Sequence, residues 1–195
     1  QKENGKETEV TLKKNLPEAP GPYFTMDVET LQKLDRGEMS ALTGLAQARS
    51  SDPTPVGLEF MPGYTPAPDF FATFVPLTFH FWARGTPEIV AFGKQYSRVI
   101  HGANMVVLYY QKGLRSAWGQ VEKGQHINKG ERDQSNPFPS MFLAIRGRLL
   151  AKIGGKEIEI HAGQMLFVPP SVAHEFWNPN DEPCEFVLVM FGEGA

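Results

Sequence analysis

Residues 163–178, GQMLFVPPSVAHEFWN, decide how the second half of this chain folds. The opening glycine marks a turn, residues 165–168 have the composition of a buried strand, and the two prolines end that strand where no ladder N–H is needed. A second short strand follows. Because strand side chains alternate between faces, His174, Phe176 and Asn178 share one face. In this position His174 is a candidate metal ligand, a candidate ligand contact, or a core residue.

Around this stretch, residues 70–195 alternate short apolar segments with turn signals. The clearest pair is the predicted hairpin in residues 151–160, AKIGGKEIEI, where Gly154 and Gly155 can take the positive φ angles of a two-residue turn. About eight short strands without helical patterns between them predict a β-sandwich or barrel. The 19 glycines, 16 prolines and 14 phenylalanines are also typical of a turn-rich β protein.

The first part of the chain has a different character. Residues 1–24 are charged and then proline-rich, and we expect them to form a flexible arm. Residues 25–69 read as a helical and Pro-rich extension that packs on the barrel. In this extension Val28, Leu31 and Leu34 recur every three residues, which predicts a helix.

The composition limits the classes of function. A formal net charge of -3 without a basic stripe argues against a nucleic-acid partner. No apolar run approaches the roughly 20 residues of a membrane-spanning helix. The single cysteine, Cys184, excludes an internal disulfide and a cysteine-based zinc cluster, and it precedes an apolar strand in which we expect it to be buried.

The polar start of the sequence suggests a cellular location. The chain begins at Gln1 without a methionine, and QKENGKETE is typical of residues that follow a cleaved secretion signal. We therefore expect a periplasmic or secreted protein, with an engineered start as the alternative.

Residues 163–178 resemble the second motif of the cupin superfamily, small β-barrels of jelly-roll topology. That motif reads G-x5-P-x-G-x2-H-x3-N, and this chain departs from it only at Ser171, which replaces the middle glycine. The matching positions are Gly163, Pro169, His174 and Asn178. The resemblance extends over roughly residues 100–192. It implies an all-β fold, a cupin-type jelly-roll barrel with a short helical, Pro-rich N-terminal segment.

The first motif of the family, G-x5-H-x-H-x3,4-E-x6-G, normally supplies two histidines and a glutamate to a metal. Gly147 fits its closing glycine, but the glutamate position falls on Ser140. The two histidine positions fall on Gly130 and Arg132. The resemblance therefore carries over His174 alone as a ligand candidate and implies that the usual metal site is largely lost.

A replacement metal site can still be assembled near the start of this motif. If the strand there continues without interruption, His126 faces the barrel interior, and Glu131 or Asp133 offers a carboxylate. Together with His174, two histidines and a carboxylate suit iron or zinc. An inward-facing Arg132 would instead disfavour a cation and grip a carboxylate or a sugar hydroxyl.

Aromatic residues offer further contacts for a ligand. The loop NPFPS, residues 136–140, holds Phe138, which could stack on a ligand at the barrel mouth or only cover an edge. Four other aromatic residues could line a cavity or belong to the core: Tyr109, Tyr110, Trp118 and Trp177.

Three functions follow from these patterns. The first is a small-molecule-binding barrel without a cofactor, whose ligand-binding residues are His174, Asn178, Arg132 and Phe176. The second is a metal-dependent enzyme of oxygenase or isomerase type that holds a divalent transition metal through His174, His126 and a carboxylate. The third is a non-catalytic homodimerisation module in which the N-terminal arm adds a strand to a neighbour's sheet. We favour the first, because residues 127–160 contain no histidine.

Overall fold

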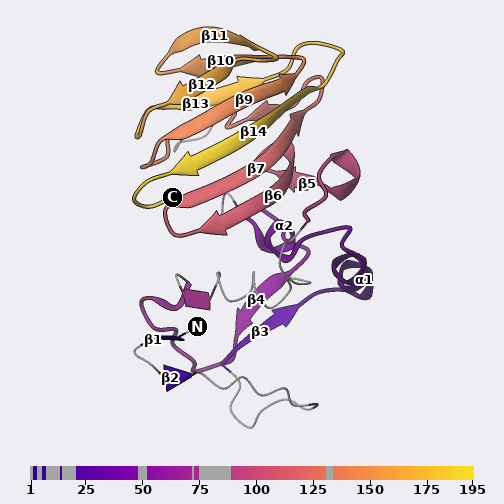
Figure 1. Cartoon of the computed structure of the whole chain (residues 1–195), viewed down its shortest axis with the longest axis vertical. Coiled ribbons are helices and arrows are strands. Elements are labelled where there is room, and N and C mark those ends of the chain that lie inside the picture. Colours follow the sequence, from indigo (N-terminus) through magenta and orange to yellow (C-terminus); the bar gives the residue numbers. More distant parts are fainter. Residues whose placement is uncertain are drawn as a thin grey trace.

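The larger part of the molecule consists of two antiparallel β-sheets, and a smaller N-terminal part lies beside strands β5 and β6 of one of them (Figure 1). The computed structural model describes residues 2–3, 6–7, 14, 21–47, 52–71, 73–74, 89–130 and 134–195.

The first sheet has six strands in the order β12-β9-β14-β7-β6-β5. Their bounds are β5 Arg98–Ile100, β6 Ala103–Gln111, β7 Leu114–Val121, β9 Ser140–Arg146, β12 Met165–Val168 and β14 Cys184–Phe191. The second sheet has four strands in the order β11-β10-β13-β8. Their bounds are β8 His126–Ile127, β10 Arg148–Ile153, β11 Lys156–His161 and β13 His174–Trp177. This arrangement confirms the predicted all-β, jelly-roll type of fold.

The inward-facing side chains of both sheets form one hydrophobic core. Phe142 of β9 is central to it. The centroid of its ring lies 4.2 Å from that of Phe176 on the other sheet and 5.4 Å from that of Phe186. Phe176 is fully buried. Burial of each such side chain stabilises the fold by about 1.5–3 kcal/mol. Because alternate strand residues point to the same face, both sheets turn apolar side chains toward each other, and these side chains make the contact between the sheets.

Glycines make the turns that keep the sheets in register. The predicted hairpin is present between β10 and β11, where Gly154 and Gly155 have φ angles of 54° and 84°. Gly147, which lies between β9 and β10, has a φ of 70°. A Cβ on Gly147 would lie 2.6 Å from the carbonyl oxygen of Pro183, so this position needs glycine both for its dihedral angles and for space.

The N-terminal part contains short elements. They are β1 Lys2–Glu3, β2 Lys6–Glu7, β3 Pro22–Thr25, α1 Val28–Arg36, α2 Ala41–Leu45 and β4 Gly57–Phe60; the 3-10 helix η1, Lys94–Tyr96, precedes β5. Strand β1 pairs with β2, and β3 pairs with β4. Phe70 and Phe74 pack against aromatic rings of β4 and β3, respectively.

The helix predicted from the spacing of Val28, Leu31 and Leu34 is present as α1. Leu34 and Thr30 are buried, whereas Val28 and Leu31 are 70% and 46% exposed. Two successive steps of three residues rotate by about 120° around a helix, while a step of four rotates by only about 40°. Thr30 and Leu34, which are four residues apart, therefore form the packing stripe of α1.

Helix α2 is attached to the sheet at β6. Thr43 Oγ1 accepts a hydrogen bond of 2.9 Å from the backbone N–H of Val107, and Ser40 Oγ donates to the carbonyl oxygen of the same residue at 3.5 Å. Arg98 on β5 donates from Nε to the Thr43 carbonyl oxygen at 2.6 Å and from Nη2 to that of Ala46. These contacts attach α2 and the residue that follows it to strands β5 and β6.

Candidate functional site

A cavity of about 1150 Å³ lies between the inner faces of the barrel sheets and the N-terminal part. Apolar and aromatic side chains make up much of its described wall. From the N-terminal part these include Phe24, Leu42, Leu45, Leu58, Phe60 and Phe74; from the barrel they include Ile100, Met105, Phe138, Phe142, Leu188 and Met190. A volume of this size exceeds the ~300–1,000 Å³ typical of small-molecule pockets.

The strand ladder brings several of the lining residues to one end of the barrel. On the six-stranded sheet, Arg115 of β7 lies opposite Tyr110 of β6 and Met190 of β14. Met190 lies in turn opposite Ser140, the first residue of β9. His174 is likewise the first residue of β13 on the four-stranded sheet, and it lines the same cavity. Side chains from both sheets thus face one another across this end.

His174 is a buried imidazole with one nitrogen committed to the backbone. It is 5% exposed, and its Nδ1 lies 3.0 Å from the carbonyl oxygen of Val172. Because a carbonyl only accepts, Nδ1 carries the proton and Nε2 of the neutral ring is an acceptor. Burial lowers the pKa of His174 below 6.5, although the bond to Val172 partly opposes this shift. The imidazole is therefore neutral near pH 7.

Two amide residues that the sequence analysis did not single out hold the backbone at His174. Asn128 Nδ2 donates to the His174 carbonyl oxygen at 2.9 Å, and the His174 N–H donates to the Gln134 carbonyl oxygen at 3.0 Å. Gln134 Nε2 closes the ring by donating to the carbonyl oxygen of Asn128 at 2.7 Å. The sequence signal for Asn128 was an asparagine directly after a strand, since asparagine tolerates the left-handed conformation found here, φ 63°.

His126 lies on the outer side of the four-stranded sheet. It pairs with Trp177, whereas the next residue, Ile127, pairs with Phe176 and enters the core. The His126 Nε2 atom is 3.1 Å from a carboxylate oxygen of Glu175. The expectation that His126 faces the barrel interior was therefore wrong.

The described residues at the cavity do not assemble the predicted metal-ligand set. Within residues 21–47, 52–71, 73–74, 89–130 and 134–195, no three histidine, cysteine or carboxylate side chains are placed to hold one ion. His174 is separated from His126 by the sheet itself. Arg132 and the two carboxylate candidates, Glu131 and Asp133, lie outside the described residues.

Asn178 and Phe176 take structural places instead of lining the cavity. The Asn178 side chain donates two bonds of 2.9 Å, to the carbonyl oxygens of Val121 and Glu182. Its Oδ1 accepts bonds from the backbone and side chain of Asn180, so the residue fixes the turn after β13. Phe176 belongs to the central core. Of the predicted ligand-binding residues that the structure describes, His174 is the one at the cavity.

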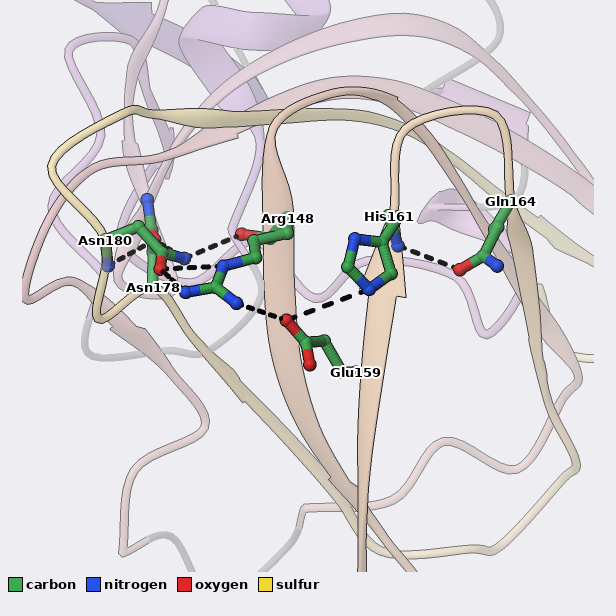
Figure 2. Close-up of polar contacts among 6 residues, drawn as sticks. All are labelled: Arg148, Glu159, His161, Gln164, Asn178 and Asn180. Carbon is green, nitrogen blue, oxygen red and sulfur yellow. Dashed lines mark hydrogen bonds and ion pairs between the residues drawn. The ribbon is translucent and has the colours of Figure 1, made fainter.

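The turn after β13 is joined to the edge of the four-stranded sheet by a polar network on the surface. Figure 2 shows the guanidinium of Arg148 between Asn180 Oδ1, at 2.6 and 2.9 Å, and a carboxylate oxygen of Glu159, at 2.8 Å. The same carboxylate oxygen lies 3.8 Å from His161, whose side chain is 55% exposed. These groups satisfy one another, so we assign the network to structure.

The aromatic candidates divide between the two sides of the sheets. Phe138 and Tyr110 line the cavity. Trp118 is 1% exposed but packs against Phe92 on the outer face of the six-stranded sheet, with 6.2 Å between ring centroids. Trp177 lies outside the four-stranded sheet, 5.3 Å from the ring of His126. The loop phenylalanine is thus placed where it can contact a ligand.

Cys184 is fully buried, as predicted, and burial raises the pKa of its thiol to about 11, so the thiol stays protonated. Among the described helices, none combines the length and the apolar character needed to cross a membrane.

Comparisons with known proteins agree with this fold. The family model described as "Cupin domain" matches residues 120–190, which include β8 to β13 and most of β14. No curated protein matches the chain.

Three solved structures illustrate the likeness. A Cupin 2 conserved barrel domain protein from Salinispora arenicola CNS-205 is 21% identical, with a TM-score of 0.48 over 55% of this chain and 91% of its own. An RmlC-like cupin family protein with a double-stranded β-helix fold, from Methanocaldococcus jannaschii, is 16% identical, with a TM-score of 0.45 over 56% of this chain and 94% of its own. A predicted oxalate decarboxylase from Thermotoga maritima is 18% identical, with a TM-score of 0.41 over 46% of this chain and 79% of its own.

The second-motif residues, the two packed sheets and the family match over residues 120–190 point to the same assignment. Residues 120–190 of this chain therefore form a cupin domain.

Proposed function

We propose that this protein binds a small organic molecule in the cavity between its barrel and its N-terminal part. The observation that carries the proposal is the position of His174, a buried, neutral imidazole at the wall of a cavity of about 1150 Å³. A few polar groups placed among apolar and aromatic side chains are the usual arrangement by which a pocket orients a ligand.

The chemistry of His174 defines one part of the ligand. Since Nδ1 donates to Val172, the ring offers Nε2 as a hydrogen-bond acceptor. The group that binds there is a donor, such as a hydroxyl or an N–H. The aromatic and aliphatic walls favour a ligand with a mostly apolar body. Arg132, which lies outside the described residues and precedes β9 in the sequence, stays in the proposal as a second polar contact.

Binding and metal content can be measured on the same protein, purified without a metal-affinity column. Ligand-observed NMR with a set of small aromatic and aliphatic alcohols, amides and acids tests the cavity. We expect binding by the wild type, loss of binding of the alcohols by His174→Gln, and unchanged binding by His161→Gln, which changes an exposed histidine.

Elemental mass spectrometry decides between binding alone and the metal-dependent alternative. A stoichiometric transition metal that disappears in His174→Gln would favour the enzyme, with a carboxylate from residues 131–133 as a further ligand. Failure of every compound to bind the wild type would reject the proposal.

The third function, homodimerisation through the N-terminal arm, is a separate hypothesis. It predicts a dimer that dissociates when residues 1–25 are deleted, and light scattering on the full and shortened chains measures this directly.

A further inference from the structure

We infer that the ligand carries a carboxylate and that Arg115, on the wall formed by the six-stranded sheet, binds it. This inference rests on the proposed function, because it names a second group of the same ligand. His174 lies on the other sheet. The two side chains would therefore hold the ligand from two different walls of the cavity.

Arg115 lies on the inner face of the sheet. Along β7 the side chains alternate, and Ala117 and Val121, which share the face of Arg115, are buried, with Val121 part of the central core. Arg115 lines the cavity together with its ladder partners Tyr110 and Met190. Its position is therefore set by the sheet and not by a surface loop.

The guanidinium is held by aromatic rings. Its central carbon lies 4.8 Å from the centroid of the Tyr110 ring and 5.4 Å from that of Phe138. Rings that contact the face of a guanidinium restrict its orientation and leave its N–H edges available for a planar partner. Arg115 is thus oriented before a ligand arrives.

The hydrogen-bonding capacity of Arg115 is largely unused within the described part of the chain. Nη2 donates to the carbonyl oxygen of Gly194 at 3.3 Å. Nε is buried and has no partner there, and no described carboxylate forms an ion pair with the residue. By contrast, Arg146 pairs with Glu182 and Glu185. A buried donor without an acceptor is costly, and a ligand oxygen would remove that cost.

A carboxylate fits this position better than a neutral acceptor. Its two oxygens match the parallel N–H groups of a guanidinium, and the bond is strengthened by charge and by the low polarity of the surrounding wall. Combined with the acceptor at His174 Nε2, the site selects an apolar acid that also carries a hydroxyl or N–H group.

The test compares acids with their uncharged amides of the same size. The pairs are 2-naphthoate, 4-phenylbutyrate and octanoate with the corresponding primary amides, measured by ligand-observed NMR and calorimetry. For the wild type we expect acids to bind about 10- to 100-fold more tightly than amides, which is the range of a charge-assisted hydrogen bond. Arg115→Met, which keeps the stem against the rings, should bind acids and amides equally. Arg115→Lys should recover part of the preference.

The controls separate this inference from a structural role and from the proposed function. Arg146→Gln, on the outer surface, should leave the preference unchanged. If Arg115→Met lowers the thermal midpoint and weakens acids and amides by the same factor, Arg115 only secures the segment at Gly194 and the inference is wrong. If the wild type binds acids and amides equally, the inference is wrong while the proposed function stands. If it binds neither, the proposed function fails first.

Discussion

His126 and His174 lie on opposite faces of the same four-stranded sheet. His126 pairs with Trp177, and its ring contacts Glu175 on the outer side. His174 lines the cavity on the inner side. Two imidazoles in these positions cannot bind one metal ion unless β8 is rebuilt.

His126→Gln should therefore leave ligand binding and metal content unchanged. The contact between His126 and Glu175 involves side chains that are 23% and 19% exposed. Since such partly solvated pairs contribute little, the free energy of unfolding should fall by no more than about 1 kcal/mol. Urea unfolding and elemental analysis measure the two effects. Loss of a bound metal in this variant would contradict the assignment of His126 to the outer face.

The protonation of His174 should make the stability of the protein depend on pH. Burial holds its pKa below 6.5 in the folded chain, so the unfolded chain binds a proton first as the pH falls. The free energy of unfolding should therefore decrease as the pH falls below 6.5 and level off below the folded-state pKa. His174→Gln should show a smaller decrease over the same range. Parallel pH profiles for the two proteins would show that the imidazole is not buried in its neutral form.

Gly147→Ala should destabilise the barrel more than Gly155→Ala. Both glycines have positive φ angles, 70° and 84°, so each substitution costs about 1–2 kcal/mol in backbone strain. At Gly147 the new Cβ also meets the Pro183 carbonyl oxygen at 2.6 Å, whereas nothing lies within 4 Å at Gly155. We expect an additional cost of about 1–3 kcal/mol at Gly147, typical of overpacking. Equal denaturation midpoints for the two variants would show that the backbone at Pro183 shifts to accept the new Cβ without a cost in stability.

Asn178→Ala should reduce stability without changing the ligand preference. The substitution leaves the carbonyl oxygens of Val121 and Glu182 without the amide that donates to them. Because each buried acceptor left unpaired costs roughly 1–3 kcal/mol, the expected loss for the two is about 2–6 kcal/mol in denaturant unfolding. The matched control Asn180→Ala, in the same turn, should cost less. Weaker ligand binding by a folded Asn178→Ala protein would show that Asn178 contributes to the ligand-binding site.

The fold was predictable because its signals were local. Gly163 and the two prolines delimit a strand and a turn, and the glycines at 154 and 155 fix a hairpin whatever surrounds them. The inward direction of His174 followed from the same alternation, since β13 contains its neighbours without interruption. Local backbone preferences and motif spacing were sufficient for these features.

The site was less predictable because it depends on pairing between distant strands. The expectation for His126 assumed a strand that continues to residue 130, but β8 ends at Ile127, and Asn128 and Gly130 both have positive φ angles. Along β7 the alternation alone favours an inward Trp118, which is the larger apolar residue. In the structure Trp118 packs outward on Phe92, and Arg115 faces the cavity. The inward faces of β7 and β8 depend on how these strands pair with their neighbours, so the sequence of either strand alone does not determine them.

The attachment of α2 to Val107 has a practical consequence for anyone who shortens this protein. Strand β5 pairs with β6 only as far as Met105, and beyond that point the hydroxyls of Ser40 and Thr43 take the place of a neighbouring strand. In a truncated barrel that starts after α2, part of β6 would become an exposed edge strand with unpaired backbone N–H and C=O groups. Such an edge can pair with the same edge of another copy and cause aggregation. A shortened protein should therefore begin before Ser40, because α2 covers this edge of the sheet and prevents self-association.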